Sequence, residues 1–331
     1  MDYALLAAGI AVLLVCGDLL VRGAVALAER LEIPTLIIGL TIVAFGTSAP
    51  ELVVSLRAAM TGSSGIALGN VVGSNIANVL IVLGLPALIA VTKCDEPHLS
   101  RNLFYVIGAS LLLIALCHFQ PLSLWHGIVL FSFMIAFLVE AGRRAALGAA
   151  DEPIPTTEDV ETIDGVSGVP HKLWASFAFL AVGLIGLPLG AHMTVLSASA
   201  IAKDFGVSEA AIGLTLVALG TSLPELAATL AAAVRGHCGI VLGNVLGSNL
   251  FNILAIMGIT AMVAPIQVPD SIKSVDLWIM LAASLAIAPA IFARKPIGRA
   301  YGLAFTSAYL LYIYLVFSPE VGGVANAALM H

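Results

Sequence analysis

Runs of about 20 apolar residues recur along the whole chain and limit what it can fold into, because a helix of that length crosses the roughly 30 Å hydrocarbon core of a bilayer. Hydrophobic residues make up 60% of the 331 residues and charged residues 10%, against about 25% charged in ordinary soluble domains. A soluble fold of this size would have too few charges to cover its surface. The sequence therefore predicts an all-α membrane protein whose main partner is the lipid bilayer, and we expect no nucleic-acid partner.

The apolar runs divide into ten predicted spans when the sequence is broken at charges, prolines and glycines. The first run follows Asp2 rather than a basic segment, so we expect a retained span and not a cleaved signal peptide. An acidic linker, 148–171, has too little apolar content to pack a core. We therefore predict one five-helix repeat in 1–147 and a second in 172–331. The predicted spans are 4–29, 34–59, 65–91, 102–118, 122–142, 172–203, 208–233, 239–264, 275–293 and 299–317.

The chain contains an internal duplication. Residues 38–84 align with residues 212–258 at a constant offset of 174 without a gap, and 28 of these 47 positions are identical. Chance does not produce such identity. Because each copy holds five spans, an odd number, the second copy must enter the membrane from the opposite side. Inverted repeats of this kind recur in secondary transporters, whose binding sites lie near the middle of the bilayer.

Basic residues indicate the orientation, because cytoplasmic loops carry an excess of Lys and Arg. With both termini outside, ten basic residues lie in inner loops and three in outer loops, while Arg22 lies within a span. The sequence therefore predicts that both termini are outside, that the acidic linker is cytoplasmic, and that the protein resides in the cell's inner (plasma) membrane. The inner residues are Arg30, Lys93, Arg101, Arg143, Arg144, Lys172, Arg235, Arg294, Lys295 and Arg299, and the outer ones are Arg57, Lys203 and Lys273.

Each copy of the repeat places a proline and a glutamate inside an apolar span, in "GTSAPE" (46–51) and "GTSLPE" (220–225). Acids within a membrane are costly and mark functional sites, so Glu51 and Glu225 are predicted to form one. Pro50 and Pro224 each remove a backbone donor, so the helix should open just before them. We expect this to free backbone carbonyls to face inward at Ala44, Phe45 and Thr47 in the first copy and at Ala218, Leu219 and Thr221 in the second.

These groups suit a hard cation. Two carboxylates, backbone carbonyls, water and the hydroxyls of Thr47, Ser48, Thr221 and Ser222 supply the six to eight oxygens that Ca²⁺ takes at about 2.3 to 2.6 Å. The repeated motifs contain no Cys or His, which argues against zinc, copper and iron. No cofactor is indicated.

A second motif, "GNVVGSNIAN" (69–78) and "GNVLGSNLFN" (243–252), follows in each copy. Ser74 and Asn78 are four residues apart, as are Ser248 and Asn252, so each pair shares one helix face. Hydroxyl and amide oxygens suit sodium. The glycines of these motifs allow facing helices to approach closely, although small residues at this spacing are also common at ordinary packing faces.

The remaining polar residues are interpreted as structural. Asp18 and Arg22 are four apart and are expected to pair along one helix face, since the repeat offset places His192 and Leu196 at their counterparts. The histidines, including His237, belong to no motif. The four cysteines show no C-x-x-C spacing, so no disulfide framework or zinc site is predicted.

The paired "GTSAPE" and "GTSLPE", together with "GNVVGSNIANVLIVLG" and "GNVLGSNLFNILAIMG", resemble the alpha-1 and alpha-2 repeats of the calcium/cation antiporter superfamily, in particular prokaryotic sodium/calcium exchangers. The resemblance implies one calcium and up to three sodium sites between spans two, three, seven and eight, with spans one and six sliding as a gate. It implies that Glu51 and Glu225 are shared carboxylates. Thr47 and Thr221 would complete the calcium site, Ala44, Ser48, Ser74, Ala218, Ser222 and Ser248 would serve sodium, and Asn78 and Asn252 would face the centre.

Some relatives carry aspartate where this chain has Asn78 or Asn252, so this site has two formal negative charges. A calcium/proton antiporter is the nearest alternative, but such relatives resemble G-N-x-x-E rather than G-T-S-x-P-E. A potassium-dependent exchanger would be expected to keep an aspartate at Asn252. An intramembrane hydrolase would need a serine with a His or Lys base, or His metal ligands, and no such pair recurs. An ATP-driven pump lacks support because there is no Walker-type phosphate loop. The sequence does not indicate an oligomeric state.

Overall fold

The structure is a computed structural model that describes residues 2–96, 98–119, 121–148, 170, 172–205 and 218–317. Most of the predicted acidic linker, and the first ten residues of the predicted seventh span, lie outside this part of the chain. The described residues are helical apart from short connections, as expected for a polypeptide that must satisfy its own backbone hydrogen bonds within lipid. The elements, with η for π-helical segments, are α1 (Asp2–Leu31), α2 (Thr35–Ile38), η1 (Gly39–Val43), α3 (Ala44–Thr47), α4 (Ala49–Met60), α5 (Ser64–Ala77), η2 (Asn78–Leu83), α6 (Gly84–Ile89), α7 (Leu99–Leu116), α8 (Leu124–Gly148), α9 (Leu173–Asp204), α11 (Ala218–Thr221), α12 (Leu223–Val234), α13 (Cys238–Leu250), η4 (Phe251–Ile256), α14 (Met257–Val263), η5 (Ile272–Asp276), α15 (Leu277–Ala286), α16 (Ala288–Phe292) and α17 (Arg299–Phe317).

The helices follow the predicted spans closely. Within the described residues, seven helices are long and apolar enough to cross a membrane, or eight if the bent pair Thr35–Thr47 and Ala49–Met60 is one span. The predicted tenth span, 299–317, is the helix α17, but it is not among those seven. The described part of the predicted seventh span consists of α11 and α12. The chain is thus an all-helical, multi-pass membrane protein.

Both proline-bearing spans are interrupted one residue before the helix that contains the proline. Helix α3 ends at Thr47 and α4 begins at Ala49, with a bend of 45° between the two segments. Ser48 at the break has φ −84° and ψ 5°, and Ser222, its counterpart in the second copy, has φ −89° and ψ 3°. The predicted opening before Pro50 and Pro224 is confirmed.

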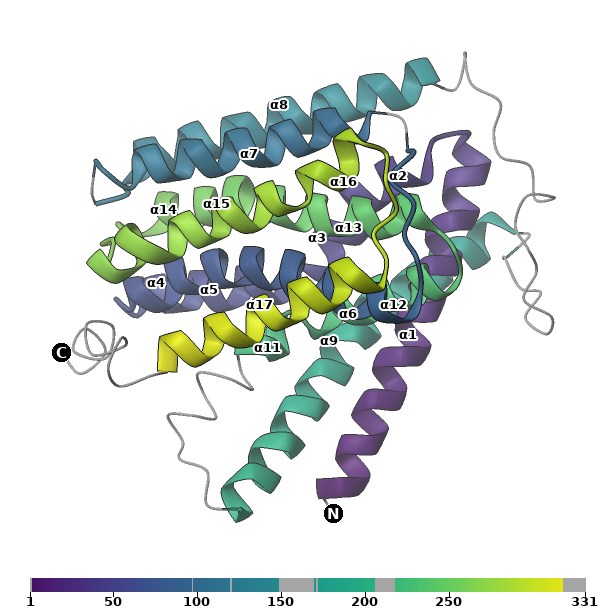
Figure 1. Cartoon of the computed structure of the whole chain (residues 1–331), viewed down its shortest axis with the longest axis horizontal. Helices are drawn as coiled ribbons and strands as arrows, with labels where there is room; N and C mark the ends of the chain where they lie inside the picture. The colour runs from purple at the N-terminus through teal and green to yellow at the C-terminus, as the bar shows by residue number, and fades with distance from the viewer. Residues whose placement is uncertain are drawn as a thin grey trace. The chain divides into compact units, whose positions relative to one another are not determined.

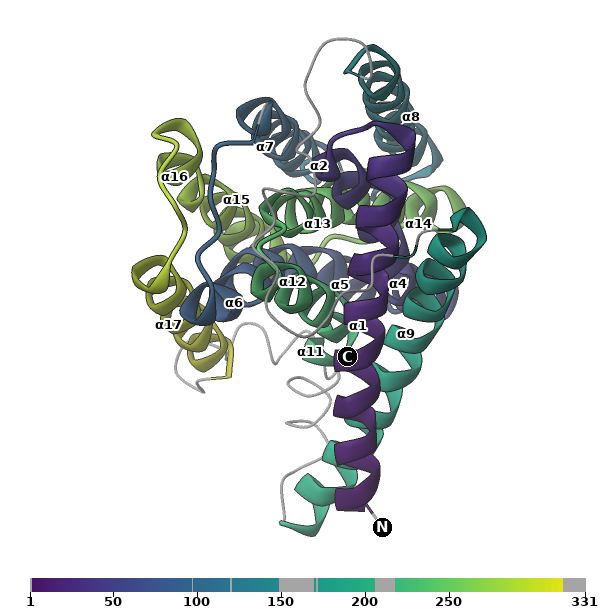
Figure 2. The same ribbon diagram turned by 90° about the vertical axis from the view of Figure 1, so that its right-hand side faces the viewer.

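The described chain divides into two compact units, called here unit 1 (Met1–Pro50 and Phe137–Ser248) and unit 2 (Glu51–Ala136 and Asn249–His331). In unit 1, α1 and α9 lie side by side, and α12 packs on α1 (Figures 1 and 2). In unit 2, α17 packs on α6 and η2, α15 packs on α7 and α5, and η4 packs on α5. Each unit therefore combines segments from both copies of the repeat.

Glycines set the close approach of α1 and α9 in unit 1. A Cβ atom added at Gly183 would lie 2.6 Å from Leu20 Cβ and 2.9 Å from the Cys16 carbonyl oxygen. A Cβ added at Gly23 would lie 2.8 Å from the backbone nitrogen of Leu180. Real Cβ atoms do not come so close to a neighbouring backbone. The two helices are therefore held together by backbone contact at small residues, as is usual within membranes.

Unit 2 uses the same principle in two other places. A Cβ atom added at Gly127 of α8 would lie 2.5 Å from the Gly258 carbonyl oxygen of α14, and one at Gly302 of α17 would lie 2.8 Å from the Gly84 carbonyl oxygen of α6. Two isolated antiparallel bridges also join the connections of one copy to those of the other, Thr92 with Ile297 and Leu122 with Ile266.

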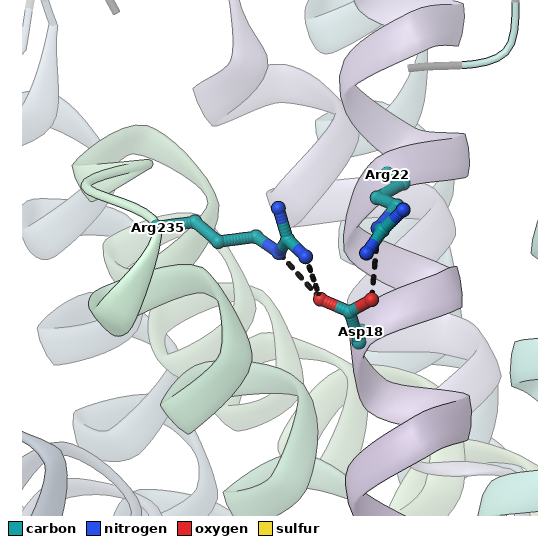
Figure 3. A network of polar contacts seen from close by, with 3 residues as sticks. All are labelled: Asp18, Arg22 and Arg235. Carbon is teal, nitrogen blue, oxygen red and sulfur yellow. Dashed lines mark hydrogen bonds and ion pairs between the residues drawn. The ribbon is translucent and has the colours of Figure 1, made fainter. Parts of the chain in front are cut away.

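An ion-pair network links α1 to the end of α12 in unit 1. Asp18 forms an ion pair with Arg22 on its own helix, with Nε 2.8 Å from Oδ2, which is the predicted helix-face pair. Its other oxygen pairs with Arg235, the residue that follows α12 (Figure 3). Burial and, to a smaller extent, the Arg235 charge together lower the pKa of the nearby His237 from 6.5 to about 4. The imidazole is therefore neutral at neutral pH, and Arg235 carries the positive charge at this turn.

Gly183→Ala should lower the stability of the protein by about 1 to 3 kcal/mol, because the new methyl group must push α1 away from α9. The measurement is the midpoint of thermal unfolding of the detergent-purified protein. Gly108→Ala is the matched control, since among the described residues nothing lies within 4 Å of a Cβ added at Gly108. Equal midpoints for the two variants would contradict the packing argument.

Candidate ion-binding site

The two glutamates of the repeated motif begin helices inside the protein. Glu51 lies in the first turn of α4 and Glu225 in the first turn of α12. Each is 1% exposed. A helix N-terminus favours negative charge because its free N–H groups and the helix dipole point toward it. The local fold thus provides some compensation for a buried carboxylate, and the rest must come from the surrounding side chains.

In unit 1 the hydroxyl residues of the first copy reach the glutamate of the second. The Ser48 hydroxyl donates to Glu225 Oε1 at 2.9 Å. The Thr47 hydroxyl lies 3.3 Å from Asn244 Oδ1 and 3.4 Å from the Ala44 carbonyl oxygen, either of which can accept its proton. The break before Pro50 and the helix start at Glu225 therefore face each other within one compact unit.

Glycines of the second motif make this approach possible. A Cβ added at Gly243 would lie 2.6 Å from the Leu36 carbonyl oxygen, and one at Gly247 would lie 2.6 Å from the Leu40 carbonyl oxygen and 2.7 Å from Ala44 Cβ. The predicted close approach is confirmed for these two glycines. Around Gly73 nothing in the described residues lies within 4 Å, but the segment equivalent to 39–43 is 213–217, which lies outside them.

In unit 2 the asparagines of both copies come together. The Asn78 amide donates to Asn249 Oδ1 at 3.1 Å, and the Asn249 amide donates to the Asn75 carbonyl oxygen at 3.5 Å. Asn78 begins the π-helical segment η2, and Asn252 is the second residue of η4. Such segments are rare and occur frequently at functional sites. Both inward-facing asparagines of the prediction thus lie where the helix widens.

Several predicted ligand residues present buried oxygen atoms that, among the described residues, have no hydrogen-bond partner. Membrane interiors make such atoms costly, and each is an oxygen that can bind a cation. They are Ser222 Oγ, Glu225 Oε2 and Ser248 Oγ in unit 1, and Asn78 Oδ1 and Asn252 Oδ1 in unit 2. The Ser74 hydroxyl differs, since it donates to the Asn70 carbonyl oxygen at 2.7 Å and leaves its lone pairs available.

One expectation about the backbone is wrong. The Ala44 carbonyl was expected to be freed by the break, but it accepts the Ser48 N–H at 3.0 Å. At the second break the Leu219 carbonyl, which was also expected to be free, accepts the Ser222 N–H at 3.1 Å. The reason is that the serine at each break keeps its N–H and can still bond to an earlier carbonyl. Proline lacks an N–H, so the carbonyl that loses its donor is the one four residues before the proline, which lies further along the chain.

The predicted site residues divide between the two units. Unit 1 holds Ala44, Thr47, Ser48, Ala218, Thr221, Ser222, Glu225 and Ser248, and unit 2 holds Glu51, Ser74, Asn78 and Asn252. Ala218 is the first residue of α11, and its side chain lies outside the described part of the structure. Within each unit, the contacts above bring part of the predicted set together.

Sequence reasoning missed five polar residues that hold the predicted ones. The sequence contained a signal for them, because each has an identical or similar polar residue at the equivalent position of the other copy. They are Asn70, Asn244, Asn249, Ser55 and Thr229. Among the described residues no group of three or more His, Cys, Asp and Glu side chains is placed to hold a metal ion.

The described chain is a helical membrane protein whose broken spans carry buried oxygens, and comparison with known proteins supplies the family. The model of the sodium/calcium exchanger protein family matches residues 1–141 and 175–318. The chain therefore belongs to the sodium/calcium exchanger family and is a transporter rather than an enzyme.

Relatives of nearly full length agree with this assignment. The putative antiporter CaxA of Alkalimonas amylolytica is 36% identical over 94% of this chain and 97% of its own length. The inner membrane protein YrbG of Escherichia coli K12 is 33% identical over 95% of this chain and 96% of its own length. A structure of the sodium-calcium exchanger NCX_Mj, soaked with Na⁺ and Sr²⁺, superimposes with a TM-score of 0.78 at 29% identity and covers 94% of this chain and 97% of that one.

Ser48→Ala should weaken cation binding by roughly three- to tenfold, because it removes a hydrogen bond to a buried carboxylate. Binding can be measured as the thermal stabilisation of the purified protein by calcium and by sodium. The control is Ser132→Ala, which removes an exposed hydroxyl that bonds within its own helix, at the Ile128 carbonyl. Affinities unchanged by Ser48→Ala would show that this serine does not support the site.

Proposed function

We propose that the protein is a secondary antiporter that exchanges sodium for calcium by alternating access, with Glu51 and Glu225 as the shared carboxylates of one site near the middle of the membrane. The observation that carries this proposal is the contact of Ser48 with Glu225 at 2.9 Å. That contact joins the broken span of one copy to the glutamate of the other. The unpartnered oxygens of Ser222, Glu225 and Ser248 lie in the same unit and favour a cation as occupant.

The proposed ligand roles follow the oxygen chemistry of each residue. Carboxylates with the oxygens of Thr47 and Thr221 would bind calcium, which takes six to eight oxygens. Asn78 and Asn252 would add neutral amide oxygens at the centre. The remaining small polar and backbone groups would bind sodium, and they belong to Ala44, Ser48, Ser74, Ala218, Ser222 and Ser248.

The charge count makes the exchange electrogenic at a three-to-one stoichiometry. Two carboxylates with one Ca²⁺ are neutral, whereas two carboxylates with three Na⁺ carry a charge of +1. Moving that charge across the membrane is worth about 2.3 kcal/mol per 100 mV. An inside-negative potential would therefore favour sodium entry and calcium exit. Because calcium and a full set of sodium ions cannot share two carboxylates, each displaces the other.

The proposal extends to topology. Ten spans in two inverted five-helix repeats, with both termini outside, agree with the distribution of basic residues and with the 174-residue offset between the copies. The pairing of α1 with α9 is compatible with two long helices that move together. We propose that the protein is located in the cell's inner membrane, because its relative YrbG is named as an inner membrane protein.

Glu51→Gln and Glu225→Gln should each abolish sodium-driven calcium uptake, because a neutral amide cannot replace the charge that balances Ca²⁺. The assay is flux of labelled calcium into sodium-loaded vesicles that contain the purified protein. Glu140→Gln is the matched control, since Glu140 is 41% exposed and pairs with Arg144 on its own helix. Asn252→Asp is expected to keep transport or alter ion preference. Normal transport by Glu51→Gln would show that the site lies elsewhere.

Calcium uptake should depend on the sodium gradient and should slow or accelerate with an imposed membrane potential. Vesicles are tested under sodium, potassium and proton gradients in turn, with the potential clamped by a potassium ionophore. We expect three sodium ions to move for each calcium ion, with net movement of charge. Uptake driven by the proton gradient and indifferent to sodium would replace the proposal by calcium/proton antiport.

A further inference from the structure

Asn70 of unit 2 joins two turns of the glutamate helix to the helix that carries Ser74. Its amide nitrogen donates to the Glu51 carbonyl oxygen at 3.1 Å and to the Ser55 hydroxyl at 2.8 Å. The Ser55 hydroxyl in turn donates to the Ala67 carbonyl oxygen at 3.3 Å. The Asn70 carbonyl accepts the Ser74 hydroxyl at 2.7 Å. Both N–H groups of the Asn70 amide are therefore used by α4.

Asn244 makes the same pair of bonds in unit 1, from the second copy of the repeat. Its amide nitrogen donates to the Glu225 carbonyl oxygen at 3.3 Å and to the Thr229 hydroxyl at 2.9 Å. Its amide oxygen lies within reach of the Thr47 hydroxyl proton, at 3.3 Å. Asn244 and Thr229 are both fully buried. The same arrangement of side chains thus holds the glutamate turn in each unit.

The arrangement acts where the helix needs support. Both glutamates lie in the first turn after a break, and the first turn of a helix has the fewest backbone hydrogen bonds to resist fraying. The asparagine amide donates to the glutamate's own carbonyl and to a hydroxyl one turn later. These two bonds fix the position of the glutamate turn along the helix axis and its rotation about that axis. The carboxylate is thereby held in place relative to the neighbouring helix, which bears the serine and asparagine of the second motif.

The same bonds occupy the amide nitrogens of both asparagines. An amide nitrogen has no lone pair to offer a cation, and the one at Asn244 uses both of its protons on α12. The Asn244 side-chain oxygen can accept the Thr47 hydroxyl proton at 3.3 Å, as the Ala44 carbonyl oxygen can at 3.4 Å. In either case the Thr47 oxygen keeps its lone pairs for a cation. Asn244 thus contacts both the glutamate turn and a proposed ligand.

We propose that Asn70 and Asn244, acting with Ser55 and Thr229, are positioning residues that set the distance between the glutamate turns and the other ion ligands. The inference rests on the proposed function, because it assigns these residues to the same site. Its consequence is selectivity: a site of fixed size binds Ca²⁺ better than the larger Sr²⁺, and a loosened one discriminates less.

The decisive variant is Thr229→Val, which keeps the shape of the side chain but removes the acceptor for Asn244. The full-length protein is titrated with calcium and, separately, with strontium, and the thermal midpoint is followed. We expect a lower midpoint without ions, because the buried Asn244 N–H loses its acceptor, and in addition a calcium affinity lowered about tenfold and a strontium affinity lowered less. In vesicles the KM for calcium should rise while the maximal rate changes by less than twofold.

The chain itself offers the conservative control, because the two copies use serine and threonine interchangeably at this position. Thr229→Ser and Ser55→Thr should each retain calcium affinity within about twofold, and Asn244→Leu should resemble Thr229→Val. If Thr229→Val matches the unmodified protein in affinity and selectivity, the positioning role is refuted. It is equally refuted if Thr229→Ser is as impaired as Thr229→Val. Failure of the unmodified protein to bind either cation would instead overturn the proposed function.

Discussion

A carboxylate buried among membrane helices is the constraint on which the rest of this structure depends. Removing a charged group from water is costly unless it is paired or hydrogen-bonded, yet Glu51 and Glu225 are each 1% exposed. Around Glu225 the structure provides a helix N-terminus, the Ser48 hydroxyl and the Asn244 amide. These groups hold the glutamate turn, while one carboxylate oxygen keeps no partner among the described residues. This oxygen is the one available to the cation in the proposed site.

The break in the helix requires tight packing around it. The break at Ser48 exposes polar backbone and hydroxyl groups that lipid cannot satisfy. Gly243 and Gly247 let α13 lie directly against η1 and α3, so the broken segment is covered by protein. The π-helical segments that contain Asn78 and Asn252 place side chains that a regular helix would direct elsewhere. Small residues and helix irregularities therefore shape the site, and the ligands are distributed around them.

The two copies of the repeat share the asparagine that holds each glutamate turn, but their other polar contacts differ. Asn70 and Asn244 keep the same hydrogen bonds in both units. The Asp18 network is not repeated, since the offset places His192 at Asp18 and Thr61 at Arg235. The asparagines that hold the glutamate turns thus recur in both copies, whereas the ion pair between α1 and the end of α12 joins Asp18 of the first copy to Arg235 of the second and has no counterpart. This difference distinguishes structural polar residues from those of the site.

The sequence by itself determined the membrane class, the positions of the helices to within a few residues, the duplication and the breaks before Pro50 and Pro224, because hydropathy and proline act locally. It also indicated the two glutamates, since a charge in an apolar span stands out without any structure. Tertiary structure alone decided the partners. It brought the Ser48 hydroxyl to Glu225, placed the Thr47 hydroxyl beside Asn244, and made Arg235 a second ion-pair partner of Asp18. Those pairs join residues far apart in the chain, and their contact depends on how closely glycine lets two backbones approach, which no local pattern specifies.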